Sequence, residues 1–427
     1  MPPTETQTAS TRPRGRPPKH GPAQEARLLS EAALILNQNG ASSLALAELA
    51  ERLGLSRNTL YHYCRDAQDL VFRCFVQSCE ATQQAIDAAA CLPTGAADRL
   101  SGFVLRRLGA DGPPLAALYD VDWLPDPGRA HIRRLEAEMV DGLADLIATG
   151  IGQGEFRPCD ARLAARCLLG VIAWVTTSES WLGDGGPESA RPQLAEAILD
   201  FFLDGLAPAS SARPLPVAPD VQSLFVRSTR PLVSADLNAA KVEFLLAEAS
   251  RLFNRRGVDG VRIDDIAAVV GATKGTLYYH FSDKADIVAR SYERAFDIFE
   301  TIMSAGIDLG TDGLSRALLV IHLNLQAQAG PLSPLAPQPG LPRVHEPLRV
   351  RLRQRAAGLR RAAIHNLVQG IEDGSCRPHD AAMIAEASAG LFLWLPRWYQ
   401  PGDPLGPRDL ADAVCDLAAF GLRRRNV

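Results

Sequence analysis

Apolar residues recur along this chain with the spacing of α-helices. The spacing i, i+4, i+7 and i+8 occurs in two corresponding stretches, at Leu28, Ala32, Ile35 and Leu36 and at Leu245, Ala249, Leu252 and Phe253. It places apolar side chains on one face of a helix. No run of alternating β-branched residues competes with this pattern, so the chain is predicted to be all-α.

The two halves of the chain repeat each other. Residues 25–75 align without a gap on residues 242–292, and residues 150–160 recur at 370–380, after which Trp174 corresponds to Trp394. A period this long indicates a tandem duplication of a unit of about 200 residues, not a solenoid of short repeats. We call the two repeats copy one and copy two.

Each copy begins with two short amphipathic helices joined by a tight turn. We expect these helices over 47–53 and 57–64 in copy one, and over 264–270 and 274–281 in copy two. Two helices joined in this way form the helix-turn-helix, whose second helix enters the major groove of DNA. The alternative is an ordinary helical corner.

The turn residues fit a helix-turn-helix. Gly54 and Gly271 suit a left-handed backbone, which costs more for a residue with a Cβ. Ser56 and Thr273 are suited to cap the second helix by accepting from its free amides. Asn37 to Gly40 and Asn254 to Gly257 each predict the end of the preceding helix.

The second helix of each pair is more polar than a core helix. Its candidate DNA-binding residues, together with the caps Ser56 and Thr273, are Arg57, Asn58, Thr59, Tyr61, His62 and Tyr63 in copy one and Lys274, Gly275, Thr276, Tyr278, Tyr279 and His280 in copy two. Cationic and amide groups at the helix start suit base edges, and the phenols and imidazoles behind them suit phosphate oxygens.

Residues 274–284, KGTLYYHFSDK, resemble the recognition-helix signature of the tetracycline-repressor (TetR) family of bacterial transcription regulators. Residues 57–67 resemble it more loosely, with Tyr63, Cys64 and Ala67 where the family has His, Phe and Lys, which bears on how strongly copy one binds DNA. The resemblance implies phosphate contacts by Tyr278, His280, Lys284, Tyr61 and Tyr63, and base contacts by Lys274, Gly275, Arg57, Asn58 and His62.

The resemblance also implies the domain organisation. Each copy is expected to hold a three-helix DNA-binding domain followed by a helical domain for ligand binding and dimerisation. The expected segments are a disordered basic arm at 1–24, the first helix-turn-helix domain at 25–90, the first helical domain at 91–206, a Pro-rich linker at 207–236, the second helix-turn-helix domain at 237–296 and the second helical domain at 297–427.

The helical domains offer candidates for a small-molecule pocket. These are Tyr119, Trp123, Trp174, Trp181, His322, Trp394 and Trp398, although aromatic residues in such helices also serve as plain core. The last helix of each copy, which we call its closing helix, carries an apolar stripe, through Phe201 in copy one and through Leu417 in copy two. We expect these helices to pack on each other across the copies, making a pseudo-dimer within one chain; packing inside each copy's own body is the alternative.

A basic arm precedes copy one. Arg14 and Arg16 lie in residues 12–19, RPRGRPPK, which resemble an AT-hook that inserts Arg into a narrow A·T-rich minor groove. A solubilising tail is the alternative. Residues 12–75, which span the arm and the helix-turn-helix part (the head) of copy one, carry +3, and the head of copy two, counted over 241–294, carries +1, whereas the chain as a whole carries −4. This balance fits DNA contact by the heads alone, and it excludes both a histone-like polycation and an acidic disordered chain.

Other classes find little support. The eight cysteines show no zinc-ligand spacing and are expected to be buried free thiols. No motif of a hydrolase, metalloprotease or nucleotide-binding enzyme occurs in a fitting place, so no enzymatic activity, metal or cofactor is expected. No uninterrupted apolar run reaches the length of a membrane span, which leaves a soluble cytoplasmic protein as the expectation.

The sequence therefore predicts a transcription regulator, a repressor released by a small-molecule effector, which binds an operator in double-stranded DNA. Because the two recognition segments differ, the operator is expected to be an imperfect palindrome. Two alternatives stay open. The chain is a small-molecule sensor or protein-interaction module with degenerate heads, or it forms a further homodimer with four heads.

Overall fold

A computed structural model of the chain describes residues 21–109, 112–178, 181, 191–209, 214–225, 234–339 and 344–425. Across these residues the fold is helical, and the extended backbone pairs only in one isolated bridge between Phe156 and Arg423. The predicted all-α class is confirmed.

Copy one has a small head and a larger helical body. The head contains α1 (Pro22–Asn39), α2 (Leu46–Leu53) and α3 (Arg57–Leu60), with the 3-10 helix η1 (Ala41–Ser43) between α1 and α2. The body contains α4 (Ala67–Ala90), α5 (Ala96–Leu108), η2 (Val121–Trp123), α6 (Gly128–Gly152), α7 (Ala161–Thr177) and α9 (Arg191–Asp204).

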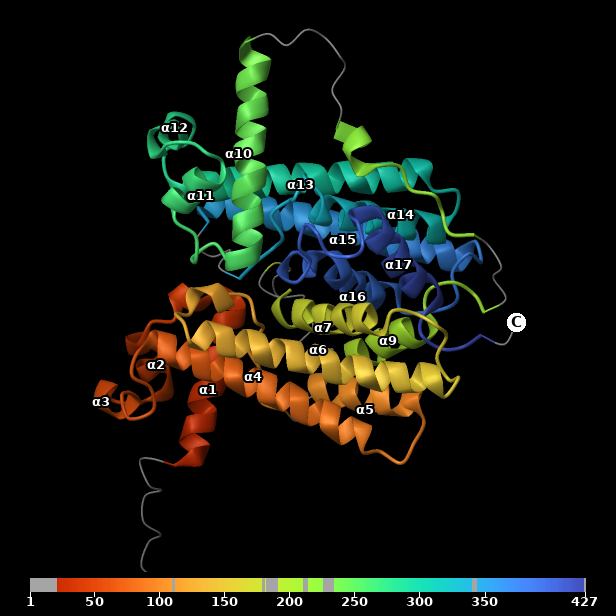
Figure 1. The fold of residues 1–427 in the computed structure, drawn as a ribbon, viewed down its shortest axis with the longest axis horizontal. Coiled ribbons are helices and arrows are strands. Elements are labelled where there is room, and N and C mark those ends of the chain that lie inside the picture. The colour runs from red at the N-terminus through yellow and green to blue at the C-terminus, as the bar shows by residue number, and fades with distance from the viewer. Residues whose placement is uncertain are drawn as a thin grey trace, which may run out of the picture.

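Copy two repeats this order. Its head contains α10 (Ser234–Arg256), α11 (Ile263–Val269) and α12 (Lys274–His280). Its body contains α13 (Lys284–Leu309), α14 (Gly313–Ala329), α15 (Glu346–Glu372), α16 (Ala381–Leu393), η6 (Leu395–Arg397) and α17 (Pro407–Phe420). The bodies stack on each other, with α7 and α9 facing α16 and α17 (Figure 1).

Repeated aspartates start the long body helices. The Asp66 carboxylate accepts from the backbone N–H of Asp69 at the start of α4, and Asp283 accepts from Asp286 at the start of α13, both at 2.8 Å. These caps satisfy amide groups that the first turn of a helix leaves without partners. The same local chemistry therefore joins head to body in both copies.

The most extensive helix contact in the fold runs between α7 and α16. The helices approach closely because Gly170 and Gly390 correspond in the two copies. A Cβ on Gly170 would lie 3.1 Å from Cβ of Trp394, and one on Gly390 would lie 3.0 Å from Cβ of Trp174. Each tryptophan thus packs over a glycine of the other copy, and the contact is reciprocal.

The segments that follow α9 and α17 cross each other in the same reciprocal way. The backbone N–H of Leu206 donates to the carbonyl of Ala418 at 3.0 Å, and that of Leu422 donates to Phe202 at 2.8 Å. Gly421 has a φ of 66°, and a Cβ there would overlap the carbonyl of Leu203. Only glycine fits both the backbone angle and the approach.

Two corresponding arginines hold this crossing. Arg157 of copy one donates to the carbonyl of Gly421 at 2.5 Å and pairs with Asp416 of copy two. Arg377 of copy two donates to the carbonyl of Gly205 at 2.6 Å and pairs with the Asp200 carboxylate of copy one at 2.8 Å. Each repeat therefore closes on the end of the other within one chain.

The closing helices contact each other less than the apolar stripes suggested. α9 and α17 meet across the copies, but α9 packs more on α5 and α16, and α17 packs mainly on α14. The larger share of the interface is the α7–α16 pair. The periodicity of α9 and α17 did not distinguish these partners, because either one buries the same stripe.

Described residues of the expected linker pack on copy two. Ala218 and Val221, the latter in η4 (Val221–Phe225), are buried against apolar side chains of α13 and α14. The Gln326 side chain bonds Pro219 and Val221 of this segment at 2.9 and 3.1 Å. A few apolar positions among the prolines are sufficient to anchor the segment on copy two.

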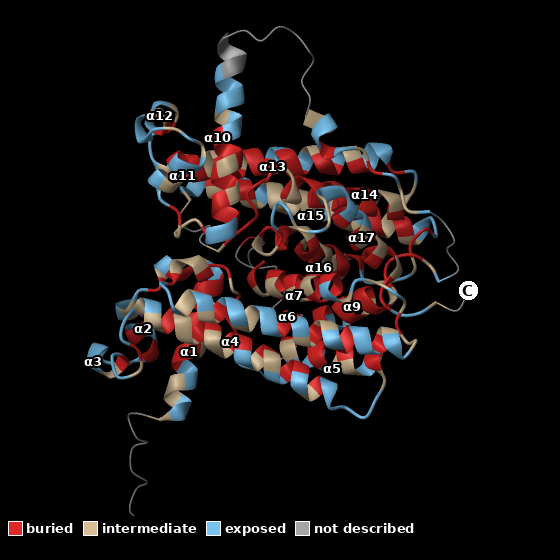
Figure 2. Ribbon diagram, in the orientation of Figure 1, coloured by how far each residue is buried: buried red, intermediate tan, exposed pale blue. Residues whose placement is uncertain are grey.

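Buried residues concentrate where the bodies meet, whereas α3 and α12 are mostly exposed (Figure 2). Six of the eight free cysteines are buried; Cys91 is exposed and Cys159 is intermediate, so the expectation of buried thiols fails at these two. Among the described helices, none has the combined length and apolarity that crossing a bilayer requires.

Candidate DNA-binding heads and effector cavities

The turns of both heads have the predicted geometry. Gly54 and Gly271 follow α2 and α11 with φ of 65° and 62°. The Ser56 hydroxyl accepts from the backbone N–H of Thr59 at 3.1 Å, and Thr273 accepts from Thr276 at 3.2 Å. The turn before α3 and the turn before α12 therefore share the left-handed glycine and the capping hydrogen bond.

The two recognition helices bury one leucine each and expose most other side chains. Leu60 and Leu277 are each 1% exposed. The exposed candidates are Ser56, Arg57, Asn58, Tyr61 and His62 in copy one and Thr273, Lys274, Gly275, Tyr278 and Tyr279 in copy two, while Thr59, Tyr63, Thr276, His280 and Lys284 are half-buried. An aromatic side chain as exposed as Tyr279, at 81%, is unusual for a core helix and suits a binding surface.

A repeated arginine donates a hydrogen bond to a backbone carbonyl at or just after the end of each recognition helix. Arg290 donates to the carbonyl of His280 at 2.9 Å, and the corresponding Arg73 donates to the carbonyl of Tyr63. Arg290 also stacks on the ring of Phe281, 4.7 Å from its centroid. Sequence reasoning did not assign a role to this arginine pair, although both positions recur in the repeat.

Copy one replaces Phe281 by Cys64, and this side chain is buried too. Burial raises the pKa of the Cys64 thiol to about 11, so it stays protonated and acts as a small apolar group. In copy two, desolvation together with Lys241 and Arg290 lowers the pKa of His280. This shift favours the neutral ring, which carries one N–H donor.

The charged group at the start of each recognition helix differs in its surroundings. Lys274 Nζ lies 3.2 Å from the Asp264 carboxylate of α11. The corresponding residues of copy one are Arg57 and Ala47, so the aspartate has no counterpart there. The charge at the start of α12 is therefore part of an exposed ion pair, whereas the corresponding position opposite Arg57 holds no carboxylate.

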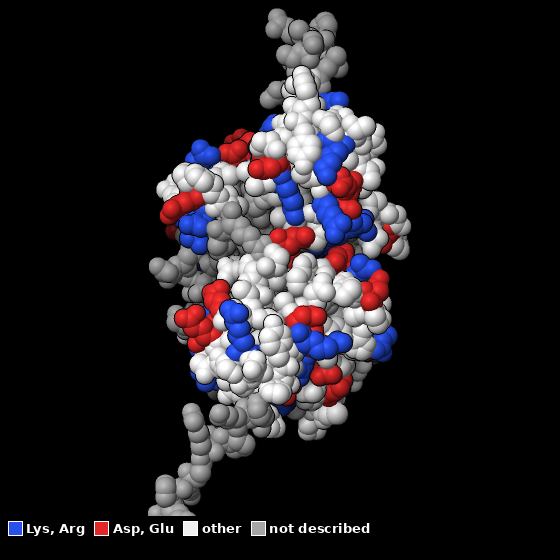
Figure 3. Space-filling model, turned by 90° about the vertical axis from the view of Figure 1, so that its left-hand side faces the viewer, with Lys and Arg blue, Asp and Glu red and all other residues white. Residues whose placement is uncertain are grey.

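Both recognition helices lie on the same side of the molecule, α3 at the lower left and α12 at the upper left (Figure 1). Figure 3 shows this side, where Lys and Arg of the described residues are interspersed with Asp and Glu. Arg14 and Arg16 of the basic arm lie outside the described residues.

A repeated asparagine ties each head to a loop of its own body. Asn37 donates to the carbonyl of Leu115 at 2.9 Å and accepts from the N–H of Ala117 at 2.8 Å. Asn254 makes the same pair of bonds with Pro334 and Ala336, both at 2.9 Å. The same two hydrogen bonds therefore connect head and loop in both copies.

Asp120 lies where the two heads come together. Its carboxylate accepts from the N–H of Ala41 at 2.8 Å, beside Gly40 of head one. It also lies so close to Gly257 of head two that a Cβ there would overlap it. Gly40 and Gly257 correspond in the repeat, so one carboxylate of copy one separates equivalent points of both heads.

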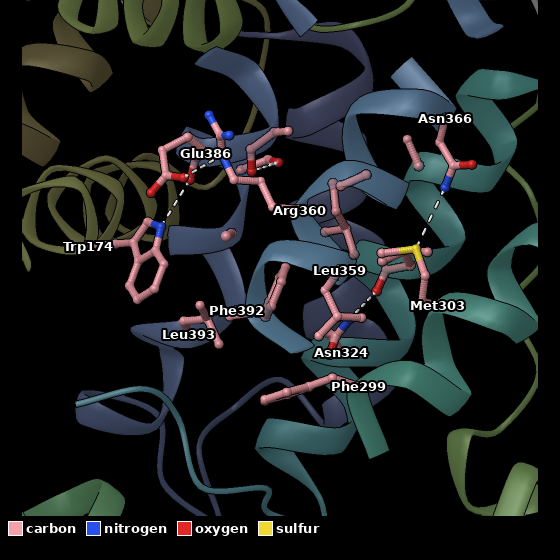
Figure 4. A pocket seen from close by; sticks show the side chains of 18 of the residues that line it. Trp174, Phe299, Met303, Asn324, Leu359, Arg360, Asn366, Glu386, Phe392 and Leu393 are labelled. Atoms are coloured by element: carbon pink, nitrogen blue, oxygen red, sulfur yellow. Dashed lines mark hydrogen bonds and ion pairs between the residues drawn. The ribbon is translucent and has the colours of Figure 1, made fainter. Parts of the chain in front are cut away.

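Copy two contains an apolar cavity of about 140 Å³. It lies among α13, α14, α15 and α16, with Phe299, Met303 and Leu359 among its walls (Figure 4). Arg360 and Glu386 are the charged groups among its described lining residues, and they form an ion pair at 3.4 Å. Burial raises the pKa of Glu386.

Copy one contains a second cavity, of about 220 Å³, between α4, α6 and α7. Its lining is far more polar than that of the first cavity. Residues of copy two close it from the other side, with Trp394 and Trp398 as flat walls.

The aromatic candidates distribute between these cavities. Trp174 and Trp181 line the cavity of copy two, whereas Trp394 and Trp398 line that of copy one. Tyr119 packs edge-on against Trp394, 4.7 Å between centroids. Trp123 in η2 and His322, which bonds Asp412 at 2.8 Å, are not among the described lining residues of either cavity. Ligand contacts by all seven residues stay predictions.

These features define a protein with two helix-turn-helix heads on paired helical bodies. The chain belongs to the tetR family of bacterial regulatory proteins. The family's N-terminal model matches residues 28–74 and 245–290, and a tetracyclin repressor-like C-terminal domain matches residues 103–206 and 341–422. It is a transcription regulator and not an enzyme.

The chain is similar to curated helix-turn-helix transcription regulators. The transcriptional repressor KstR2 of Mycobacterium tuberculosis is 25% identical over 206 residues, 46% of this chain and 98% of that protein. The negative regulator IcaR of the biofilm operon in Staphylococcus epidermidis is 38% identical over 76 residues. That match covers 17% of this chain and 41% of IcaR.

Solved structures also align over about one copy. The KstR2 structure covers 43% of this chain and 95% of its own, with 23% identity and a TM-score of 0.38. A structure of AibR with isovaleryl coenzyme A and operator DNA covers 43% and 99%, with 22% identity and a TM-score of 0.34.

Proposed function

We propose that this chain represses transcription as a pseudo-dimer, in which one polypeptide supplies both heads to an imperfect palindrome and a small-molecule effector releases it. The reciprocal closure through Arg157 and Arg377 carries this proposal. Each arginine uses the other copy as its partner, so the surface that a single TetR unit would offer to a second chain is occupied within the chain.

The unlike recognition helices support an asymmetric operator. Arg57 and Asn58 stand where copy two has Lys274 and Gly275, and the two pairs offer different hydrogen-bond donors to base edges. A symmetric operator would satisfy only one of them at each half-site. Half-sites of unequal sequence follow from this difference.

The contacts of Asn37, Asn254 and Asp120 support effector release. They join both heads to body loops that border the cavities, so a ligand with unequal affinity for two loop positions shifts the spacing of the heads. Because successive major-groove faces are one helical turn apart, a changed spacing weakens binding by both heads together.

The test begins with DNA fragments of the host genome that the full chain retains, and with the mass of the complex. We expect light scattering to give one 46.0 kDa chain per operator and footprinting to give two unequal half-sites. Lys274→Ala is expected to cost about 1–3 kcal/mol of operator binding and to relax specificity at one half-site alone.

Three results would contradict the proposal. Two chains per operator would indicate a dimer with four heads, and identical half-sites would remove the asymmetry. Absence of DNA retention even at low salt, where phosphate contacts are strongest, would favour a sensor with degenerate heads.

A further inference from the structure

The two cavities carry opposite charges at one corresponding position. Arg166 of α7 lines the cavity of copy one, and its counterpart in the repeat, Glu386 of α16, lines that of copy two. Trp174 and Trp394 also correspond, and each lines the cavity of the other copy. The duplicated framework is thus retained while the chemistry inside it has diverged.

The charges in the copy-two cavity compensate each other. Glu386 is 5% exposed and faces Arg360 at 3.4 Å. The remaining described walls are apolar or carry amides and hydroxyls, as Asn324 and Asn366 do. This cavity suits a neutral, mainly apolar molecule.

The copy-one cavity has an excess of guanidinium groups. Its described lining includes Arg107, Arg133, Arg162, Arg166 and Arg397 against one carboxyl group, that of Glu136. Arg133 is paired with Asp122 at 2.9 Å, and Arg162 is paired with Asp141.

Arg166 and Arg397 differ from the paired arginines. Within the described part of the chain, neither has a carboxylate oxygen within 4.0 Å; both stack on rings instead, Arg166 on Trp398 at 4.9 Å and Arg397 on Tyr119 at 4.5 Å. Desolvation lowers the pKa of both arginines, and burial raises that of Glu136. Both arginines are partly buried, so an anion that enters the cavity offsets part of the cost of their desolvation.

We propose that the copy-one cavity binds a small molecule with an oxyanion group, a carboxylate or a phosphate, on an apolar body. The planar forks of Arg166 and Arg397 match the oxygens of such a group. The indoles of Trp394 and Trp398, with Met139 and Ile172, offer apolar surface to the remainder of the molecule. As an effector site, this assignment rests on the proposed function.

Arg397 connects this cavity to the heads. It donates to the carbonyl of Tyr119 and stacks on its ring, and the Tyr119 hydroxyl donates to the carbonyl of Pro337 at 3.3 Å. The next residue, Asp120, separates Gly40 from Gly257. An anion that draws the Arg397 guanidinium into the cavity competes with the Tyr119 carbonyl and loosens the loop that sets the spacing of the heads.

The experiment compares matched ligands on the full chain by calorimetry without DNA. Benzoate and phenyl phosphate supply the two oxyanions, and benzamide is the uncharged analogue of benzoate. We expect at least one anion to bind about tenfold or more tightly than benzamide. Arg166→Met is expected to abolish that preference, and Arg166→Lys is expected to restore part of it by returning the charge without the fork.

Arg134→Met is the matched control. Arg134 lies on α6 beside Arg133, but its side chain is 61% exposed and does not line the cavity. We expect this variant to bind like the wild type. Arg397→Met provides a second disruption, should Arg166→Met fail to fold by circular dichroism.

The proposal is overturned if benzamide binds as well as both anions, if neither anion binds up to its solubility limit, or if Arg134→Met loses as much affinity as Arg166→Met. Because calorimetry requires no operator, the ligand affinities can be interpreted even if the chain does not bind DNA. Benzoate and phenyl phosphate together tell which oxyanion fits.

Discussion

In head two, Arg290 stacks on the buried ring of Phe281, whereas head one has the smaller Cys64 and Arg73 at the corresponding positions. The caps, the left-handed glycines and the arginine support are common to both heads. The side chains that would meet DNA differ. Duplication has therefore kept the caps, glycines and arginines that hold the recognition helix, and divergence has fallen on what that helix presents and on the buried residue at its end.

Phe281→Ala gives the largest expected difference between the heads. Truncation of a buried phenylalanine leaves a cavity and removes the stacking partner of Arg290, so opening of head two should become easier by about 3–5 kcal/mol. Hydrogen exchange of the amides of α11 and α12 measures this opening, while the body helices should keep their protection.

Cys64→Ala is the matched change in head one. It removes one sulfur atom, and we expect α2 and α3 to lose about 1 kcal/mol. Equal losses in the two heads would mean that Phe281 does not stabilise head two more than Cys64 stabilises head one.

Removal of the helix caps should destabilise the two heads equally, because both heads share these caps. Ser56→Ala and Thr273→Ala each leave amides at the start of a recognition helix without an acceptor, at an expected cost of about 1 kcal/mol. Exchange at the amides of Thr59 and Thr276 reports the two losses separately. A loss confined to one head would contradict the equivalence of the turns.

Asp264→Ala has the smallest expected effect, and it tests the proposed DNA-binding surface of head two. It frees Lys274 from an exposed ion pair, so we expect operator binding to tighten by about 0.2–1 kcal/mol, with the gain shrinking at high salt. Ala47→Asp places the same carboxylate opposite Arg57 and should weaken binding by a similar amount.

The control for overall charge is Asp308→Ala, which removes an exposed carboxylate from the far end of α13. If Asp308→Ala tightens operator binding as much as Asp264→Ala does, the gain comes from net charge and not from the release of Lys274. Binding titrations at two salt concentrations separate these explanations.

The sequence predicted the features that depend on neighbouring residues. The helical class, the turns at Gly54 and Gly271 and the caps at Ser56 and Thr273 follow from local geometry and periodicity, and all are present. The repeat at Arg157 and Arg377 was also visible, but its purpose was not, because each arginine binds residues more than 170 positions away.

The cavities were less accessible to prediction for the same reason. Tryptophans at 174 and 394 were identified as candidates, yet nothing in their spacing indicates that each lines the opposite copy. No sequence pattern distinguishes Arg166 and Glu386, since a single charged residue on an apolar helix normally faces water. Asp120 lies in a loop that contacts both heads, and no sequence pattern marks such a place.

The crossing at Gly205 and Gly421 joins two halves that are inherited as one gene product. In an assembly of identical subunits, every substitution appears twice and must be tolerated on both sides of the axis. Here a substitution alters one copy alone, and the other copy stays covalently attached at a fixed effective concentration. The proposed single-chain function therefore implies a first-order response to protein level, with no subunit exchange to mix variants.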